Sequence, residues 1–341
     1  MIDLRRSLLV LALLAATLAG GCWSVPENSV VVYSALDSEF SEPILKQFAA
    51  ETGIAVLPKF DVESTKTVGL VNAIITEKDR PRADVFWNNE IVNTLRLRDQ
   101  GLLDVYVSPV GQQYPEVFRG ADGRWYGFAA RARVLLVNTG LVPDNQRPTS
   151  IQDLADPKWR GKTGIAKPLF GTTATHAACL FAAWGEEKAK MYFLALKAND
   201  VQIMSGNKQV AQSVASGQLA FGITDTDDAM IEKEKGAPVT IVYPDREPHQ
   251  LGTLFIPNTL SIIKGCPHPE QARKLVDYLL QPAVEAKLAA GASAQIPLNP
   301  NTQAAARVET PKTVKAMPVD FDAAVKMWDR AAEFIRAEFA M

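Results

Sequence analysis

The sequence predicts an α/β protein with two lobes, each a mostly parallel sheet flanked by helices. The first observation behind this prediction is that short β-branched runs alternate with amphipathic helical patterns, in two successive series along the chain. Strands that alternate with helices in this way usually form a parallel sheet with both faces covered. The second observation is the length of 341 residues, which exceeds what a single hydrophobic core usually serves.

The first series lies in the N-terminal third of the chain. A β-branched run at 29–33 predicts a buried strand, and an apolar stripe at helical spacing predicts a helix over 40–52. Gly53 is expected to end that helix. The next expected elements are a strand at 54–60, a helix at 67–78 and a third strand at 84–87.

The second series follows a long extended segment at 125–138, which contains Arg131 and Arg133. Strand-length apolar runs again alternate with helical ones. Helices are expected after Gly171 and around 210–215. The expected strands are 164–166, 201–204, 220–224 and 239–243.

The C-terminal third is expected to return to the first lobe before it ends on the second. An apolar stretch at 251–263 and an amphipathic helix at 269–280 suit the return, and 320–339 is a second amphipathic pattern. The resulting organisation is a linker at 22–28, a first lobe of 29–130 and 251–290, a second lobe of 131–250, and a C-terminal segment, 291–341, packed on the second lobe.

The first 21 residues have the pattern of a bacterial export signal. Arg5 and Arg6 give a positively charged start, the apolar run that follows is too short to span a bilayer, and small residues precede Cys22. This ending is similar to a lipobox, in which the cysteine is diacylated and two acyl chains hold a soluble domain to a membrane. We expect a periplasmic or extracytoplasmic protein with a lipidated Cys22. The alternative is an ordinary signal peptide whose cysteine is incidental.

The composition of the chain limits which kinds of partner it can have. The chain carries 36 basic and 38 acidic residues, a net charge of −2, and this balance indicates no nucleic-acid partner. Cys179 and Cys266 are expected as two buried thiols rather than a disulfide. No segment after the signal is apolar for long enough to cross a membrane.

Polar side chains follow the predicted strands of both lobes, at the carboxyl ends where parallel α/β sheets bind ligands. Taken singly, each could be a helix N-cap, because Ser, Thr, Asp and Asn are preferred there. Six such sites on two lobes favour a pocket between the lobes. The expected ligand-binding residues are Ser34, Asp37, Asn88, Asn89, Arg131, Gly171, Thr172, Thr173, Asn207, Asp225, Asp227 and Asp228.

Together these features resemble the extracellular solute-binding proteins of ABC importers, in particular the ferric-iron-binding branch. The motifs that carry the resemblance are VVYS at 31–34, ADVFW at 83–87, GLL at 101–103, RARV at 131–134, NKQV at 207–210 and QIPLNP at 295–300. The resemblance implies a type II periplasmic-binding-protein fold whose lobes are joined by a two-stranded hinge. It also implies a monomer without a cofactor that closes over its ligand and delivers it to ABC permease subunits.

The sequence departs from the ferric-iron branch at the expected metal ligands. Iron binders of this branch place a histidine or tyrosine after the first strand, often a carboxylate or tyrosine after the third, and adjacent tyrosines late in the second lobe. Here those positions hold Asp37, Asn89 and the aspartates Asp225, Asp227 and Asp228. Because Fe³⁺ accepts carboxylate oxygens, these last three aspartates form a candidate metal site, with a synergistic anion bound beside the iron.

A small anionic or zwitterionic organic solute is the alternative ligand, for example a phosphonate, a sugar phosphate or a polyamine-like molecule. Three carboxylates within four positions repel one another unless a positive group is near, and an ammonium group would supply it. Arg131 and Arg133 share a strand face, so one of them could reach the cleft and bind an acid group.

A phosphatase-like hydrolase is the alternative from another class. The segment 223–227 resembles the nucleophilic aspartate loop of haloacid-dehalogenase-type phosphatases, with Asp225 and Asp227 as the reacting carboxylates. That motif belongs at the first strand of its domain, whereas here a complete lobe precedes it. No serine stands in a nucleophile-elbow context, and no His/Cys spacing makes a zinc site. We therefore expect a binding protein and not an enzyme.

Overall fold

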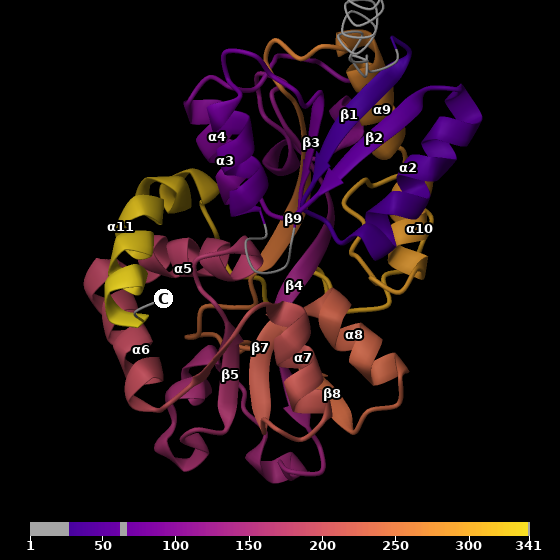
Figure 1. The fold of residues 1–341 in the computed structure, drawn as a ribbon. Coiled ribbons are helices and arrows are strands. Elements are labelled where there is room, and N and C mark those ends of the chain that lie inside the picture. Colours follow the sequence, from indigo (N-terminus) through magenta and orange to yellow (C-terminus); the bar gives the residue numbers. More distant parts are fainter. Residues whose placement is uncertain (1–26, 62–66, 340–341) are drawn as a thin grey trace, which may run out of the picture.

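The computed structural model describes residues 27–61 and 67–339, so the predicted signal peptide and Cys22 lie outside the described residues. Figure 1 shows the predicted α/β architecture, with one lobe above the other and two strands passing between them. One mixed sheet of nine strands runs through both lobes in the order β2-β1-β3-β9-β4-β7-β5-β6, and β8 pairs with β4.

The first lobe is built on parallel strands whose central member is buried. Val30 and Val32 of β1 are fully buried, which the β-branched run predicted, whereas β2 is an exposed edge strand. Gly53 ends α2 with a left-handed φ of 69°, a conformation that glycine adopts without steric strain. The elements are β1 (Ser29–Ser34), α2 (Ser38–Thr52), β2 (Ala55–Phe60), α3 (Val68–Thr76), β3 (Val85–Asn88) and α4 (Val92–Asp99).

The second lobe repeats the pattern with β5 between β6 and β7, all three parallel. Its apolar core contains Phe221, Phe181 and Phe193, and these side chains come from β7 and from the helices that cover one face of the sheet. The elements are β5 (Thr163–Ala166), α5 (Gly171–Trp184), α6 (Glu186–Ala198), β6 (Gln202–Met204), α7 (Asn207–Ala215), β7 (Phe221–Asp225), α8 (Thr226–Glu234) and β8 (Val239–Val242).

Two antiparallel strands join the lobes. The strand β4 (Tyr126–Asn138) pairs with β9 (Phe255–Ile262) along its first half and with β7 and β8 along its second half. The backbone N–H of Arg133 donates to the carbonyl of Leu254 at 2.9 Å, which extends the pairing to the segment before β9. These crossing strands form the two-stranded hinge.

The C-terminal segment contacts both lobes rather than the second lobe alone. Ile296 pairs with Ala130, and Leu298 packs against the core of the first lobe. The last helix lies against α5 and α6 of the second lobe and also against α4 of the first (Figure 1). The helices of this part are α9 (Pro269–Leu279), α10 (Pro282–Ala290) and α11 (Phe321–Phe339).

Four helices, α4, α6, α8 and α10, were not predicted as separate elements. In α4 five of the eight residues are buried, among them the polar Asn93 and Thr94, so no apolar stripe distinguishes one face. Cys179 and Cys266 are free thiols in the described part of the chain, as expected, although Cys266 is only partly buried. Among the described helices, none combines the length and the apolar run that crossing a bilayer requires.

Packing of α11 gives a test of the fold. Ile335 is fully buried in the core of the second lobe. We expect Ile335→Ala to lower the free energy of unfolding by about 2–5 kcal/mol, because it removes buried methyl groups and leaves a cavity. Urea unfolding measures the loss, and Glu333→Ala at an exposed position of the same helix is the control. A loss equal to that of the control would show that α11 is not part of the folded core.

Candidate functional site

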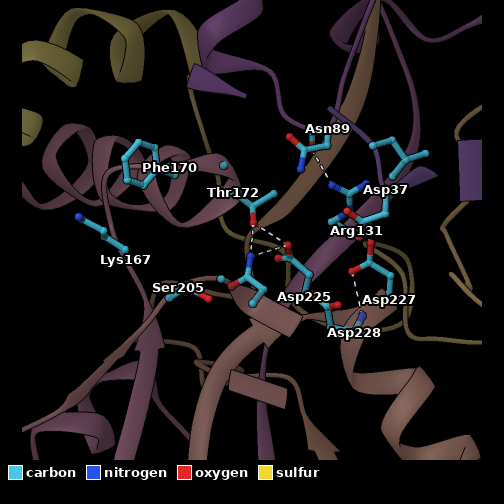
Figure 2. Close-up of a pocket in the computed structure, with 15 residues that line it drawn as sticks. Asp37, Asn89, Arg131, Lys167, Phe170, Thr172, Ser205, Asp225, Asp227 and Asp228 are labelled. Carbon is cyan, nitrogen blue, oxygen red and sulfur yellow. Dashed lines mark hydrogen bonds and ion pairs between the residues drawn. The ribbon is translucent and has the colours of Figure 1, made fainter. Parts of the chain in front are cut away.

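A polar cleft opens where the strand ends of the two lobes face each other (Figure 2). The first lobe contributes the loop after β1 and the loop after β3, and the second contributes the loops after β5, β6 and β7. The predicted residues that line this cleft are Asp37, Asn89, Arg131, Gly171, Thr172, Asn207, Asp225, Asp227 and Asp228.

Four helices begin at the cleft: α2, α5, α7 and α8. The first turn of a helix has unpaired backbone N–H groups and a partial positive charge, so these four starts favour an anionic group. Asp37 and Asp225 stand at N-cap positions, but neither side chain makes a capping hydrogen bond. The N-cap explanation therefore does not account for these two aspartates.

Asp225 is held by Arg133, which projects from the crossing strand β4. One carboxylate oxygen accepts from Arg133 Nη1 at 2.7 Å. The other accepts from Thr172 Oγ1 at 2.5 Å and from Asn207 Nδ2 at 3.0 Å. The Asp225 and Arg133 side chains are 6% and 1% exposed, so this is a buried charge pair with its oxygens satisfied.

Asp227 forms an ion pair with Arg131, which lies two residues before Arg133 on β4. The Arg131 Nε atom lies 3.2 Å from Asp227 Oδ2, and Nη1 donates to the backbone carbonyl of Asn89 at 2.6 Å. Arg131 thus reaches the cleft, as predicted, but it binds the protein's own carboxylate there. The positive partner that three clustered aspartates require is supplied in part by the chain itself.

Carboxylate oxygens of Asp225, Asp227 and Asp228 all lie within 4.8 Å of one another, and the three residues are buried. A cation between them would meet hard oxygen ligands. Two arginines face these three aspartates, so the formal charges of these five side chains sum to −1. This arrangement suits a cation or the positive end of a ligand.

Three predicted site residues lie outside the cleft lining. Ser34 is fully buried and donates to a backbone carbonyl of the following loop. Asn88 is also fully buried and donates to Glu90 Oε1 at 2.9 Å. Thr173 accepts from Arg133 Nη2 at 3.2 Å, behind the guanidinium. Ser34 and Asn88 at the strand ends and Thr173 in the first turn of α5 turn inward because buried polar groups need partners within the protein.

The prediction missed part of the second lobe's wall. Lys167 follows β5 directly, so the rule that strand ends form the site could have found it. Its Nζ atom lies 5.5 Å from the ring centroid of Phe170, which also lines the cleft. Ala166 of the second lobe also lines the cleft, as do Leu36, Ser205 and Gly206, which belong to predicted strand-end stretches but were not among the expected ligand-binding residues.

Known proteins with a similar sequence or fold include solute-binding and iron-binding proteins. The family model described as bacterial extracellular solute-binding protein matches residues 86–326. Iron uptake protein A1 of Synechocystis sp. is 27% identical over 273 residues, which are 77% of this chain and 74% of the relative. The major ferric iron-binding protein of Neisseria meningitidis serogroup A is 25% identical over 96% of this chain and 98% of its own length. The structure of iron-bound HitA from Pseudomonas aeruginosa superposes with a TM-score of 0.81 at 24% identity and covers 91% of this chain and 98% of its own.

His176 gives a test of the charge arrangement behind the cleft. It is buried in α5, in a small cavity that Arg133 also lines. Burial and, to a lesser degree, the charge of Arg133 lower the pKa of His176 to about 3. The folded state therefore keeps a neutral imidazole where the unfolded state, with a pKa of about 6.5, binds a proton. Stability contributed by this neutral form is present above pH 6.5 and is lost as the pH falls below it.

We expect the free energy of unfolding to fall between pH 7 and pH 5 by about 2 kcal/mol more in the wild type than in His176→Gln. Urea unfolding at the two pH values measures this difference. His249→Gln, at an exposed histidine, is the control and should behave as the wild type. Equal pH dependence in wild type and His176→Gln would mean that His176 titrates normally.

Proposed function

Because the chain belongs to the bacterial extracellular solute-binding proteins, we propose that it captures ferric iron or a related small ligand between its lobes and delivers it to the permease of an ABC importer. The observation that carries this proposal is the buried cluster of Asp225, Asp227 and Asp228 in the cleft between the lobes. The names of the two relatives, iron uptake protein and ferric iron-binding protein, support iron as the first candidate.

Ferric iron fits the chemistry of this cluster. Fe³⁺ is a hard cation that binds carboxylate oxygens well. The starts of α5 and α7, with Thr172 and Asn207, would hold a synergistic anion beside the iron through their free N–H groups and polar side chains. In this proposal the protein needs no resident cofactor and catalyses no reaction, and its whole task is binding.

Closure would couple binding to delivery. Asp37 and Asn89 of the first lobe face the aspartates of the second lobe across the cleft (Figure 2). A ligand that contacts both walls binds the closed form better than the open form, and this preference alone shifts the equilibrium toward closure. The permease would then recognise the closed form of the monomer, which is the form that the ligand favours.

A small zwitterionic or anionic organic solute is the second candidate. Asp225 and Asp227 already have arginine partners, and among the described residues that line the cleft none is a tyrosine or histidine. An acid group would meet the four helix starts, and an ammonium group would meet the carboxylates of the aspartate cluster. Phosphonates, sugar phosphates and polyamine-like molecules fit this description.

The N-terminus completes the proposal. We infer that the mature chain begins at a diacylated Cys22, is held at an extracytoplasmic membrane surface, and reaches its permease there. The two acyl chains predict that the exported protein partitions into detergent and that Cys22→Ala moves it to the aqueous phase. Phase separation followed by intact-mass measurement tests this. An unmodified Cys22 in the exported protein would contradict the proposal.

Affinity for iron is expected to depend on Asp228. Substituting Asp225 or Asp227 would leave a buried arginine without its carboxylate and destabilise the fold, so Asp228→Asn is the cleaner variant. We expect it to raise the Kd for ferric iron, supplied as ferric citrate, by roughly tenfold or more, because one anionic ligand is lost. Tryptophan fluorescence or calorimetric titration measures the Kd.

Asp79→Asn is the matched control, because Asp79 is an exposed aspartate of the first lobe. Thermal-shift titrations of the wild type with ferric citrate, an aminophosphonate and a sugar phosphate decide between the two candidate ligands. Stabilisation by an organic solute but not by iron would replace the first candidate with the second. An unchanged Kd for iron in Asp228→Asn would remove the aspartate cluster from the site.

A further inference from the structure

Arg131 is held on three sides by parts of the chain that are far apart in sequence. Its Nη1 atom donates to the carbonyl of Asn89 in the first lobe, and its Nε atom faces Asp227 of the second lobe. Its Nη2 atom donates to Asn258 Oδ1 on β9 at 2.9 Å. The residue is 1% exposed although it lines the cleft, so these contacts fix the plane of the guanidinium.

A β-bulge puts Arg131 on the face where Asn258 can reach it. Phe128 pairs with Asn258 and Arg131 pairs with Ile256, so β4 advances three residues where β9 advances two. The extra residue moves Arg131 to the same face as Phe128, opposite to strict alternation along the strand. Within the bulge, Ala129 has a positive φ of 43°, which is sterically unfavourable for a residue with a Cβ.

Two buried side chains hold this bulge. Ala129 N–H donates to Glu285 Oε1 at 2.7 Å, and the carbonyl of Ala129 accepts from Asn258 Nδ2. The same Asn258 amide donates to Gln295 Oε1 at 3.0 Å. Asn258 therefore links the strained bulge, the loop that carries Gln295, and the arginine of the cleft.

We propose that Asn258 is a positioning residue for ligand capture, which acts by fixing the Arg131 guanidinium against Asp227 at the junction of the two lobes. This inference rests on the proposed function only in that the cleft binds the ligand. Asn258 is fully buried and does not line the cleft. Without its Oδ1 atom, Nη2 loses its acceptor, and the guanidinium can turn away from the geometry that the aspartates require.

A double-mutant cycle separates positioning from general structural support. Arg131→Lys keeps the positive charge but lacks the fork that contacts Asn258. We expect Asn258→Ala to raise the Kd for ferric citrate roughly tenfold in the wild-type background, and less than about twofold in the Arg131→Lys background. Equal losses in both backgrounds would overturn the proposal.

A second readout needs no ligand. A guanidinium whose two Nη atoms are held by hydrogen bonds should give a sharp Arg131 Nε–Hε cross-peak in ¹⁵N NMR spectra, assigned by its disappearance in Arg131→Lys. We expect Asn258→Ala to broaden or remove this peak in the ligand-free protein. If the wild type does not bind ferric citrate, the iron proposal fails, while this peak still decides the role of Asn258. A peak unchanged by Asn258→Ala would overturn that role.

Two further variants complete the design. Gln295→Leu removes the acceptor that orients the Asn258 amide, and it replaces Asn258→Ala as the test if Asn258→Ala fails to fold. Gln295→Leu must then lower the affinity for ferric citrate by less than the tenfold expected for Asn258→Ala, and this loss must again disappear in the Arg131→Lys background. An unchanged affinity in Gln295→Leu would count against the proposal. Asn199→Ala is the matched control. Asn199 is a buried asparagine of the second lobe whose amide donates to the carbonyls of Leu154 and Asp156. It should change stability without changing the Arg131 peak or the Kd.

Discussion

Two buried charge pairs hold the centre of this molecule together. Arg131 and Arg133, on the strand that crosses between the lobes, pair with Asp227 and Asp225 at the start of α8. A buried ion without its partner is strongly destabilising, so these four side chains must be placed together. The charge of the cleft is therefore set by the fold before a ligand arrives, and one extra carboxylate gives it a negative excess.

The strand β4 carries both arginines and also forms half of the hinge, so the charge pairs of the cleft lie on a strand that joins the lobes. The lobes also touch beyond the hinge: Thr175 donates to Glu90 at 2.5 Å, and Lys208 Nζ lies 3.0 Å from Glu39 Oε1. The exposed pair contributes little energy, whereas the hydrogen bond between Thr175 and Glu90 is buried. The two lobes therefore contact each other outside the crossing strands as well.

The same cleft combines features that suit opposite charges. The helix starts favour an anion, and the carboxylates favour a cation. A ferric ion with a synergistic anion satisfies both, and so does one zwitterionic molecule with its two ends apart. The fold defines where a ligand binds, while the residues of the cleft decide which ligand it is.

Local sequence patterns determined the lobes, most strands and the position of the polar cleft at the strand ends. Periodicity reports which face of an element is buried, and Gly53 and the β-branched run of β1 carry that information within a few residues. Only the tertiary structure decided which charges pair, because Arg133 and Asp225 are 92 positions apart. It also decided that Ser34 and Asn88 turn inward and that a bulge at Ala129 brings Asn258 to Arg131. These outcomes depend on strand register and on competition among buried polar partners, which no local pattern records.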